Sequence, residues 1–181
     1  MQLRDVHVEY RKNPIGLDVK RPRFSWKLDS DKQNCLQEAY QIRIVETDSG
    51  KCVWNTEKVM GGQSVLVEYA GKSLQPETAY QVSVHVWDNQ AEEAEAECIF
   101  ETGLLHPETM EADWITSGFA EDEKACPVFF KDVSLNGKVK KARIYATALG
   151  LYQIDLDGKK VGEDFFTPGW TSYHHRVQVQ T

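Results

Sequence analysis

The chain has 181 residues, a length that allows one large domain or two small ones. Its 28 acidic residues outnumber its 21 basic ones, and the net charge of -7 argues against nucleic acid and against an anionic membrane surface as partners. No stretch reaches the roughly 18 consecutive apolar residues that a membrane span needs, and residues 1–5 have no apolar core that could serve as a signal peptide. We therefore expect a cytoplasmic protein without nucleic-acid or membrane partners. A neutral sugar is compatible with this charge.

The first half of the chain predicts a series of short strands. Apolar residues alternate with polar ones in seven segments that are bounded by turn residues. These segments are 3–10, 23–28, 39–46, 53–59, 64–69, 80–87 and 97–102. The run 91–97, AEEAEAE, contains helix-forming residues but has no apolar face, so we interpret it as a solvated loop or a strand edge.

The segment before the sixth strand carries the most specific signal of the first half. Leu74, Pro76 and Tyr80 follow the pattern Leu-x-Pro-x-x-x-Tyr, which is typical of the tyrosine corner of fibronectin type III sandwiches. The pattern predicts that the tyrosine hydroxyl bonds back to the loop before it. Seven strands with turns about every 8–12 residues predict an immunoglobulin-like or fibronectin type III-like sandwich over residues 1–103. The tryptophans on its strands, Trp26, Trp54 and Trp87, are predicted to lie in the core.

Residues 104–110 are interpreted as a linker, because Gly103 and Pro107 mark a break in composition. Residues 111–181 predict a second β-sandwich. Its strands are expected at 114–115, 128–133, 139–147, 151–156 and 176–179. Asp157-Gly158 has the chemistry of a two-residue hairpin loop, so residues 159–161 should return antiparallel.

The second domain is shorter than a complete sandwich, which needs about 100 residues. We therefore expect it to be truncated, with an exposed sheet edge and an uncovered apolar face. Such an edge favours association between copies, so a homo-oligomer is a second expectation.

An aromatic loop near the end of the chain is the candidate binding site. Trp170 and Tyr173 offer ring faces on which the apolar face of a sugar stacks, and Asp164 and His174 flank them with polar groups. The alternative is that Trp170 and Phe166 are packed in a core or between domains and are fixed by the Pro-Gly pair at 168–169.

No catalytic residue, metal site or cofactor is predicted. Asp155 and Asp157 lie two apart, but the first is interpreted as a solvated strand residue and the second as a turn residue. A calcium site in the acidic loops 121–123 or 163–164 is the weaker alternative, because neither loop has the regular oxygen-ligand spacing of a calcium-binding loop. The four cysteines lie far apart without a C-x-x-C pair, which predicts reduced thiols rather than a zinc site or a disulfide framework.

Four motifs carry a resemblance to a known family. They are VEYRKNPIGLD at 8–18, PRFSWKL at 22–28, FETGLL at 100–105 and the hairpin and loop ATALGLYQIDLDGKKVGEDFFTPGWTSY at 146–173. The sequence resembles the N-terminal region of bacterial α-L-rhamnosidases, glycoside hydrolase family 78. This chain has Asp-Gly where the family usually has Asn-Gly, and Thr167 where the family often has alanine. Both departures keep the turn chemistry.

The resemblance implies an all-β chain, in which an immunoglobulin or fibronectin type III-like sandwich is followed by a truncated jelly-roll-like β-sandwich. It implies a parent enzyme that hydrolyses terminal α-L-rhamnosides with inversion, whose acid and base lie on an (α/α)6 barrel that this sequence lacks. That barrel and a rhamnosyl glycan are the implied partners. Three functions stay open: a non-catalytic part of such an enzyme, an independent carbohydrate-binding module, and a pair of immunoglobulin-like protein-interaction domains.

Overall fold

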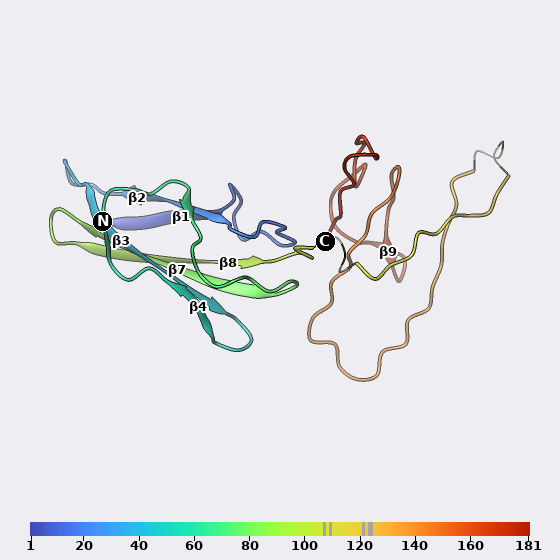
Figure 1. Cartoon of the computed structure of the whole chain (residues 1–181), viewed down its shortest axis with the longest axis horizontal. Helices are drawn as coiled ribbons and strands as arrows, with labels where there is room; N and C mark the ends of the chain where they lie inside the picture. Colours follow the sequence, from blue (N-terminus) through green and yellow to red (C-terminus); the bar gives the residue numbers. More distant parts are fainter. Residues whose placement is uncertain (107, 109, 121, 123–124) are drawn as a thin grey trace. The chain divides into compact units, whose positions relative to one another are not determined.

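The computed structural model describes residues 1–106, 108, 110–120, 122 and 125–181. The chain divides into two compact units, Met1–Thr109 and Met110–Thr181, which are described separately below (Figure 1). Every regular element in the described residues is a β-strand, which confirms the all-β prediction. These residues also contain no helix with the length and apolar character needed to span a membrane. Pro107 and Thr109 of the predicted linker lie outside the described residues.

The first unit is a sandwich of two antiparallel sheets (Figure 1). The three-stranded sheet has the order β1 (Gln2–Val8), β2 (Arg23–Asp29) and β6 (Val67–Glu68). The larger sheet has the order β4 (Cys52–Asn55), β3 (Gln37–Glu46), β7 (Ala79–Asp88) and β8 (Glu93–Glu101), and β5 (Val59–Met60) also pairs with β3. The two sheets enclose one hydrophobic core.

Strict alternation along β7 builds the centre of that core. Tyr80, Val82, Val84 and Val86 are each 0% exposed, because successive side chains of a strand point to opposite faces. The ring of Tyr80 stacks on Phe100 with 5.2 Å between the centroids. The inward face of β7 therefore anchors the sandwich.

The tyrosine corner is confirmed. The hydroxyl oxygen of Tyr80 accepts a hydrogen bond of 2.8 Å from the backbone N–H of Gln75, and Leu74 beside it is only 7% exposed. The loop before β7 is therefore tied to the strand that follows it.

Three predictions in the first unit need adjustment. The strand predicted at 53–59 is wrong as one element: β4 ends at Asn55 and β5 begins at Val59, and between them Glu57 has a positive φ of 54°. The strand predicted at 64–69 shrinks to β6. The run 91–97 is not a loop, since β8 begins at Glu93, and the strand-edge alternative is correct because β8 lies at the end of the sheet order. In β1, a register shift between Arg4 and His7 turns Val6 inward.

The prediction that Trp87 lies in the core is wrong. Trp26 is 3% exposed and Trp54 packs against the core cluster, but Trp87 alternates out of phase with the buried residues of β7 and stands on the outer face of the sheet. The signal was present in the sequence, because Trp87 lies an odd number of positions after Tyr80.

The second unit contains one short hairpin, β9 (Asp155–Leu156) paired with β10 (Lys159–Lys160). The predicted turn is confirmed, because Asp157 and Gly158 both have positive φ values, 50° and 75°, and the N–H of Val161 donates to the carbonyl of Ile154 over 2.8 Å. Isolated bridges join Ala146 to Gln180 and Tyr152 to Thr167.

The other strand predictions for the second unit are wrong. Residues 114–115, 128–133 and 176–179 form no strand, 139–147 contributes only the bridge at its penultimate residue, and 151–156 is a strand only at its last two residues. Alternation gives a segment strand character, but the strand forms only where a neighbour pairs with its N–H and C=O groups. Val128 and Phe130 are 91% and 85% exposed, so no layer covers this segment.

Candidate functional site

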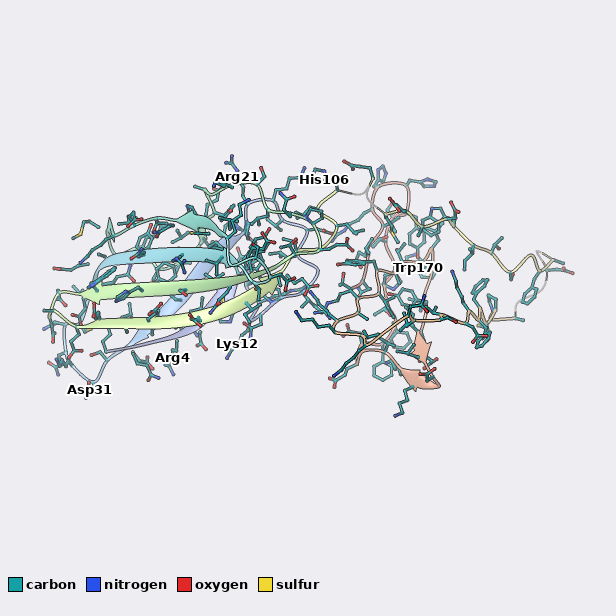
Figure 2. All side chains as sticks on the ribbon, turned by 90° about the horizontal axis from the view of Figure 1, so that it is seen from below. Arg4, Lys12, Arg21, Asp31, His106 and Trp170 are labelled. Carbon is teal, nitrogen blue, oxygen red and sulfur yellow. The ribbon has the colours of Figure 1, made fainter. Side chains whose placement is uncertain are left out.

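The predicted aromatic loop is exposed. Trp170, labelled in Figure 2, is 84% exposed, and its ring centroid lies 6.4 Å from that of Tyr173 with an angle of 35° between the planes. Phe165 and Phe166 are 77% and 79% exposed. Neither Trp170 nor Phe166 is therefore buried in a core, and the two rings of Trp170 and Tyr173 form a tilted pair at the surface.

The polar residues predicted to flank this pair are both exposed. Asp164 contributes its backbone carbonyl, which accepts a hydrogen bond of 2.6 Å from Lys160 Nζ. The same ammonium group lies 3.5 Å from the centroid of Phe165, a cation–π contact that holds the start of the loop. The carboxylate of Asp164 and the imidazole of His174 thus face solvent on the same loop as the two rings.

Tyr173 adds a feature that the sequence did not indicate. Its hydroxyl oxygen is buried and has no hydrogen-bond partner among the described residues. Buried polar atoms in proteins are nearly always hydrogen-bonded, so this hydroxyl is an exception, but its burial gives a ligand no direct access to it.

The carboxylates considered as an acid/base pair have structural roles. Asp155 and Asp157 are both exposed; Asp155 accepts hydrogen bonds of 3.1 and 3.2 Å from Gln153 Nε2, and Asp157 forms the hairpin turn. Within residues 1–106, 108, 110–120, 122 and 125–181, no group of three or more His, Cys, Asp or Glu side chains could hold a metal ion. Glu121 and Glu123, part of the acidic loop considered for calcium, lie outside the described residues.

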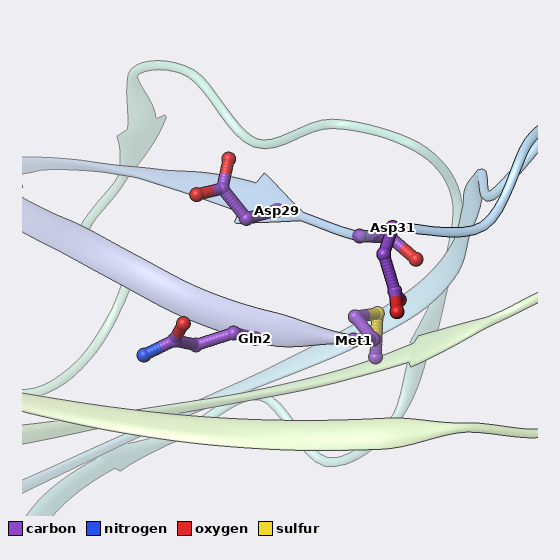
Figure 3. A pocket seen from close by; sticks show the side chains of 5 residues that line it. Met1, Gln2, Asp29 and Asp31 are labelled. Atoms are coloured by element: carbon purple, nitrogen blue, oxygen red, sulfur yellow. The ribbon is translucent and has the colours of Figure 1, made fainter.

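A hollow of about 480 Å³ lies in the first unit where β1 begins and β2 ends (Figure 3). Asp29 and Asp31 line it, but Figure 3 shows their carboxylates pointing in different directions. Asp29 is already paired with Arg4 over 2.6 Å. The hollow therefore presents no converging acids.

Two ionisable groups with a strongly raised pKa lie in the core of the first unit. Burial raises the pKa of Tyr69 to about 12, and its hydroxyl donates to the carbonyl of Lys72 over 2.5 Å. Burial likewise raises the pKa of the Cys98 thiol to about 12. Neither group lies in an open pocket, so both shifts reflect packing rather than catalysis.

The two-sheet sandwich with its tyrosine corner defines an immunoglobulin-like β-sandwich protein. The profile described as "Rha78A-like, N-terminal immunoglobulin domain" matches residues 3–106, and the chain belongs to this family. A second profile, "Alpha-L-rhamnosidase N-terminal domain", matches residues 137–181. The chain therefore contains two successive matches to N-terminal domains, which confirms the resemblance to α-L-rhamnosidases.

Individual relatives agree with this assignment. An α-L-rhamnosidase of Streptomyces avermitilis is 34% identical over 181 residues, which cover 85% of this chain and 18% of that protein. The crystal structure of the Streptomyces avermitilis α-L-rhamnosidase complexed with L-rhamnose has a TM-score of 0.60 at 39% identity, over 64% of this chain and 12% of that one. The α-L-rhamnosidase structure from Dictyoglumus thermophilum has a TM-score of 0.86 at 32% identity, over 98% of this chain and 22% of that one.

The chain spans about a fifth of the length of the curated relatives that it matches. The match to the Dictyoglumus thermophilum structure covers 98% of the chain, so it includes the second unit, although that unit has few strands of its own.

Proposed function

We propose that this chain is a non-catalytic N-terminal part of a glycoside hydrolase similar to α-L-rhamnosidases, and that it packs against the catalytic domain and helps to shape the mouth of the active site. The observation that carries the proposal is the succession of two N-terminal domain profiles along one short chain. The parent enzyme hydrolyses terminal α-L-rhamnosides with inversion.

The exposed apolar side chains of the second unit support a packing role. Val128, Phe129, Phe130 and Val133 are all more than half exposed, although such residues are usually covered. Burying a side chain of this size stabilises a protein by about 1.5–3 kcal/mol. A catalytic domain that covers this segment would therefore stabilise both partners.

Complementation in trans tests this role. The Streptomyces avermitilis α-L-rhamnosidase is shortened by the region that this chain matches, and hydrolysis of p-nitrophenyl α-L-rhamnoside is followed with and without added chain. We expect no turnover by the chain alone and a longer active lifetime of the shortened enzyme when the chain is added. Chain carrying Val84→Asp, which places a charge in the core, is the control and should give no rescue.

Turnover by the chain alone would contradict the non-catalytic assignment. Failure of the intact chain to bind the shortened enzyme in analytical ultracentrifugation would contradict the packing role.

The geometry of the aromatic loop favours a second candidate function, binding of a rhamnosyl sugar without cleavage. The supporting features are the 84% exposure of Trp170 and the neighbouring ring of Tyr173, 6.4 Å away between centroids. An exposed indole offers a stacking face for the apolar side of a sugar ring.

Titration with L-rhamnose, followed by tryptophan fluorescence, tests this function. We expect saturation below tens of millimolar, the weak end of specific affinity, and loss of the response in Trp170→Ala. Trp114→Ala is the matched control, because Trp114 is also exposed (64%) but lies far from this loop in sequence. Repeating the titration with calcium and with a chelator tests the calcium alternative. An equal response of both variants would remove the proposed site.

A further inference from the structure

The outer face of the five-stranded sheet carries an apolar row at one end. The strand register places Met60 beside Ala39, Ala39 beside Trp87, and Trp87 beside Glu93. Met60 is 71% exposed. A hollow of about 390 Å³ lies over this row, and it is named here the Trp87 groove; it is lined by Glu38, Lys58, Met60, Trp87 and Asn89, among others.

Much of the rest of the same face is polar and internally paired, although Ile99, opposite Gln81, is an exposed apolar residue (51%). Glu97 accepts hydrogen bonds of 2.7 Å from Gln81 Nε2 and 3.0 Å from Ser83 Oγ, and Gln41 Nε2 donates to Asn55 over 2.8 Å. Met60 and Trp87 therefore lie at one end of the face, beside a part whose polar side chains are already paired with one another.

Both faces of the Trp87 ring are occupied. The imidazole of His85 stacks on the ring with a centroid distance of 4.1 Å and a plane angle of 24°. The ammonium group of Lys58 lies 4.2 Å from the ring centroid. The indole is thus held in one orientation, and no stacking face remains for a sugar. Only its edge is available to line the groove.

Carboxylates dominate the surroundings of the groove. Glu38 and Glu93 are exposed, and Glu95 follows on the same face of β8. Glu93 lies 3.2 Å from His85 Nε2, and the cation of Lys58 is directed at the ring. A partner with basic residues complements this rim, whereas a second copy of this chain, with its net charge of -7, is repelled.

We propose that the Trp87 groove is a docking surface for an extended polypeptide segment with an apolar anchor flanked by basic side chains. The anchor enters between Met60 and the edge of Trp87, and the flanking cations pair with Glu38, which lines the groove, and with Glu93, which lies opposite Trp87 on β8. Protein–protein interfaces often have tryptophan and methionine at their centre and charged residues at their rim, and the Trp87 groove has the same composition. This surface lies in the first unit and does not depend on the function proposed above.

Two synthetic peptides with the same Leu-Phe-Leu centre, one flanked by lysines and one by glutamates, test the proposal. Each is titrated into the full isotope-labelled chain while the indole N–H of Trp87 and the methyl group of Met60 are followed by NMR. We expect the lysine peptide to shift both signals with a Kd of about 0.1–1 mM. The glutamate peptide should bind at least tenfold more weakly.

The Met60→Ser variant separates docking from simple charge attraction, because it leaves the net charge unchanged. We expect it to weaken binding of the lysine peptide at least fivefold, while Met60→Leu retains binding. Val65→Ser is the matched control at another exposed apolar residue (61%) and should have no effect.

Three results would each overturn the proposal. The first is equal affinity of the wild-type chain and Met60→Ser for the lysine peptide, which indicates binding by net charge. The second is a dimer in sedimentation experiments that Met60→Ser dissociates, which makes a second copy the occupant. The third is a shift of the Trp87 signal by L-rhamnose.

Discussion

Removal of a single hydroxyl group tests the role assigned to the tyrosine corner. Tyr80→Phe deletes only the acceptor of the 2.8 Å hydrogen bond from the Gln75 N–H and leaves the ring stacked on Phe100. A hydrogen bond of this kind contributes about 0.5–1.5 kcal/mol, and leaving a donor unsatisfied costs about 1–3 kcal/mol. Since the Gln75 side chain is exposed, water can reach the freed N–H in part, so we expect a loss of about 1–2 kcal/mol.

Urea unfolding of the full chain, with tryptophan fluorescence and circular dichroism as probes, measures this loss. The midpoint should fall while the m-value stays constant, and each kcal/mol corresponds to a shift in Tm of about 4–8 °C for a unit of this size. Hydrogen exchange at the Gln75 amide should accelerate in Tyr80→Phe. Gln75→Ala is the control, because it keeps the backbone donor and should be neutral.

A loss below about 0.3 kcal/mol with unchanged exchange at the Gln75 amide would refute this reasoning, since the hydrogen bond would then contribute nothing to stability. A loss above about 4 kcal/mol would also refute it, because that magnitude requires disrupted packing of the ring rather than one missing bond.

Three further predictions concern acid stability, thiol reactivity and core packing. The hydrogen bond from Arg23 holds the pKa of Glu9 below its ordinary value of 4.5. This pair therefore contributes stability above pH 4.5, and that contribution is lost as the pH falls through the lowered pKa. Arg23→Gln should flatten the acid side of a plot of unfolding free energy against pH. Because burial raises the pKa of Cys98 to about 12, iodoacetamide at about pH 8 should alkylate the exposed Cys126 at once and Cys98 only after unfolding, as peptide mass spectrometry will show. Ile42→Val, at a site that is 0% exposed, should lower the free energy of unfolding by about 0.5–1.5 kcal/mol in urea titrations.

Each of these predictions has a result that would contradict it. Parallel acid profiles of the wild type and Arg23→Gln would show that Glu9 is not coupled to Arg23. Rapid labelling of Cys98 in the folded chain would contradict its burial. Val128→Ala, at a residue that is 91% exposed, should change stability by less than about 0.5 kcal/mol; a larger loss than that of Ile42→Val would contradict the location of the core.

The corner of the first unit and the hairpin turn of the second could be predicted from the sequence because their signals are local. Leu74, Pro76 and Tyr80 specify a corner through their spacing, and the structure forms the expected hydrogen bond. Asp157 and Gly158 specify a hairpin turn because they tolerate positive φ, and they adopt it. The break at Glu57 was missed: it lies between the two pairings with β3, where the N–H of Glu57 donates to Asn55 Oδ1 over 3.1 Å.

One of the two candidate sites could be found from the sequence, and the other could not. The aromatic loop was found from composition, but only the structure revealed the exposure of Trp170 and the unpartnered hydroxyl of Tyr173. The Trp87 groove was missed, because it combines residues of β5, β3 and β7 that only the strand register brings into one row. Nothing in the sequence indicates that Met60 and Trp87 lie close together in space.

The sequence by itself determined the strand character, the turns and the family of this chain, because each depends on neighbouring residues. The tertiary structure decided which alternating segments became strands and which face of each strand was buried. Residues 128–133 alternate less regularly than β7 but are similarly apolar, yet only β7 has strands on both sides. The physical reason is that a β-strand is completed by hydrogen bonds to its neighbours, and those neighbours are chosen by the fold rather than by the strand's own residues.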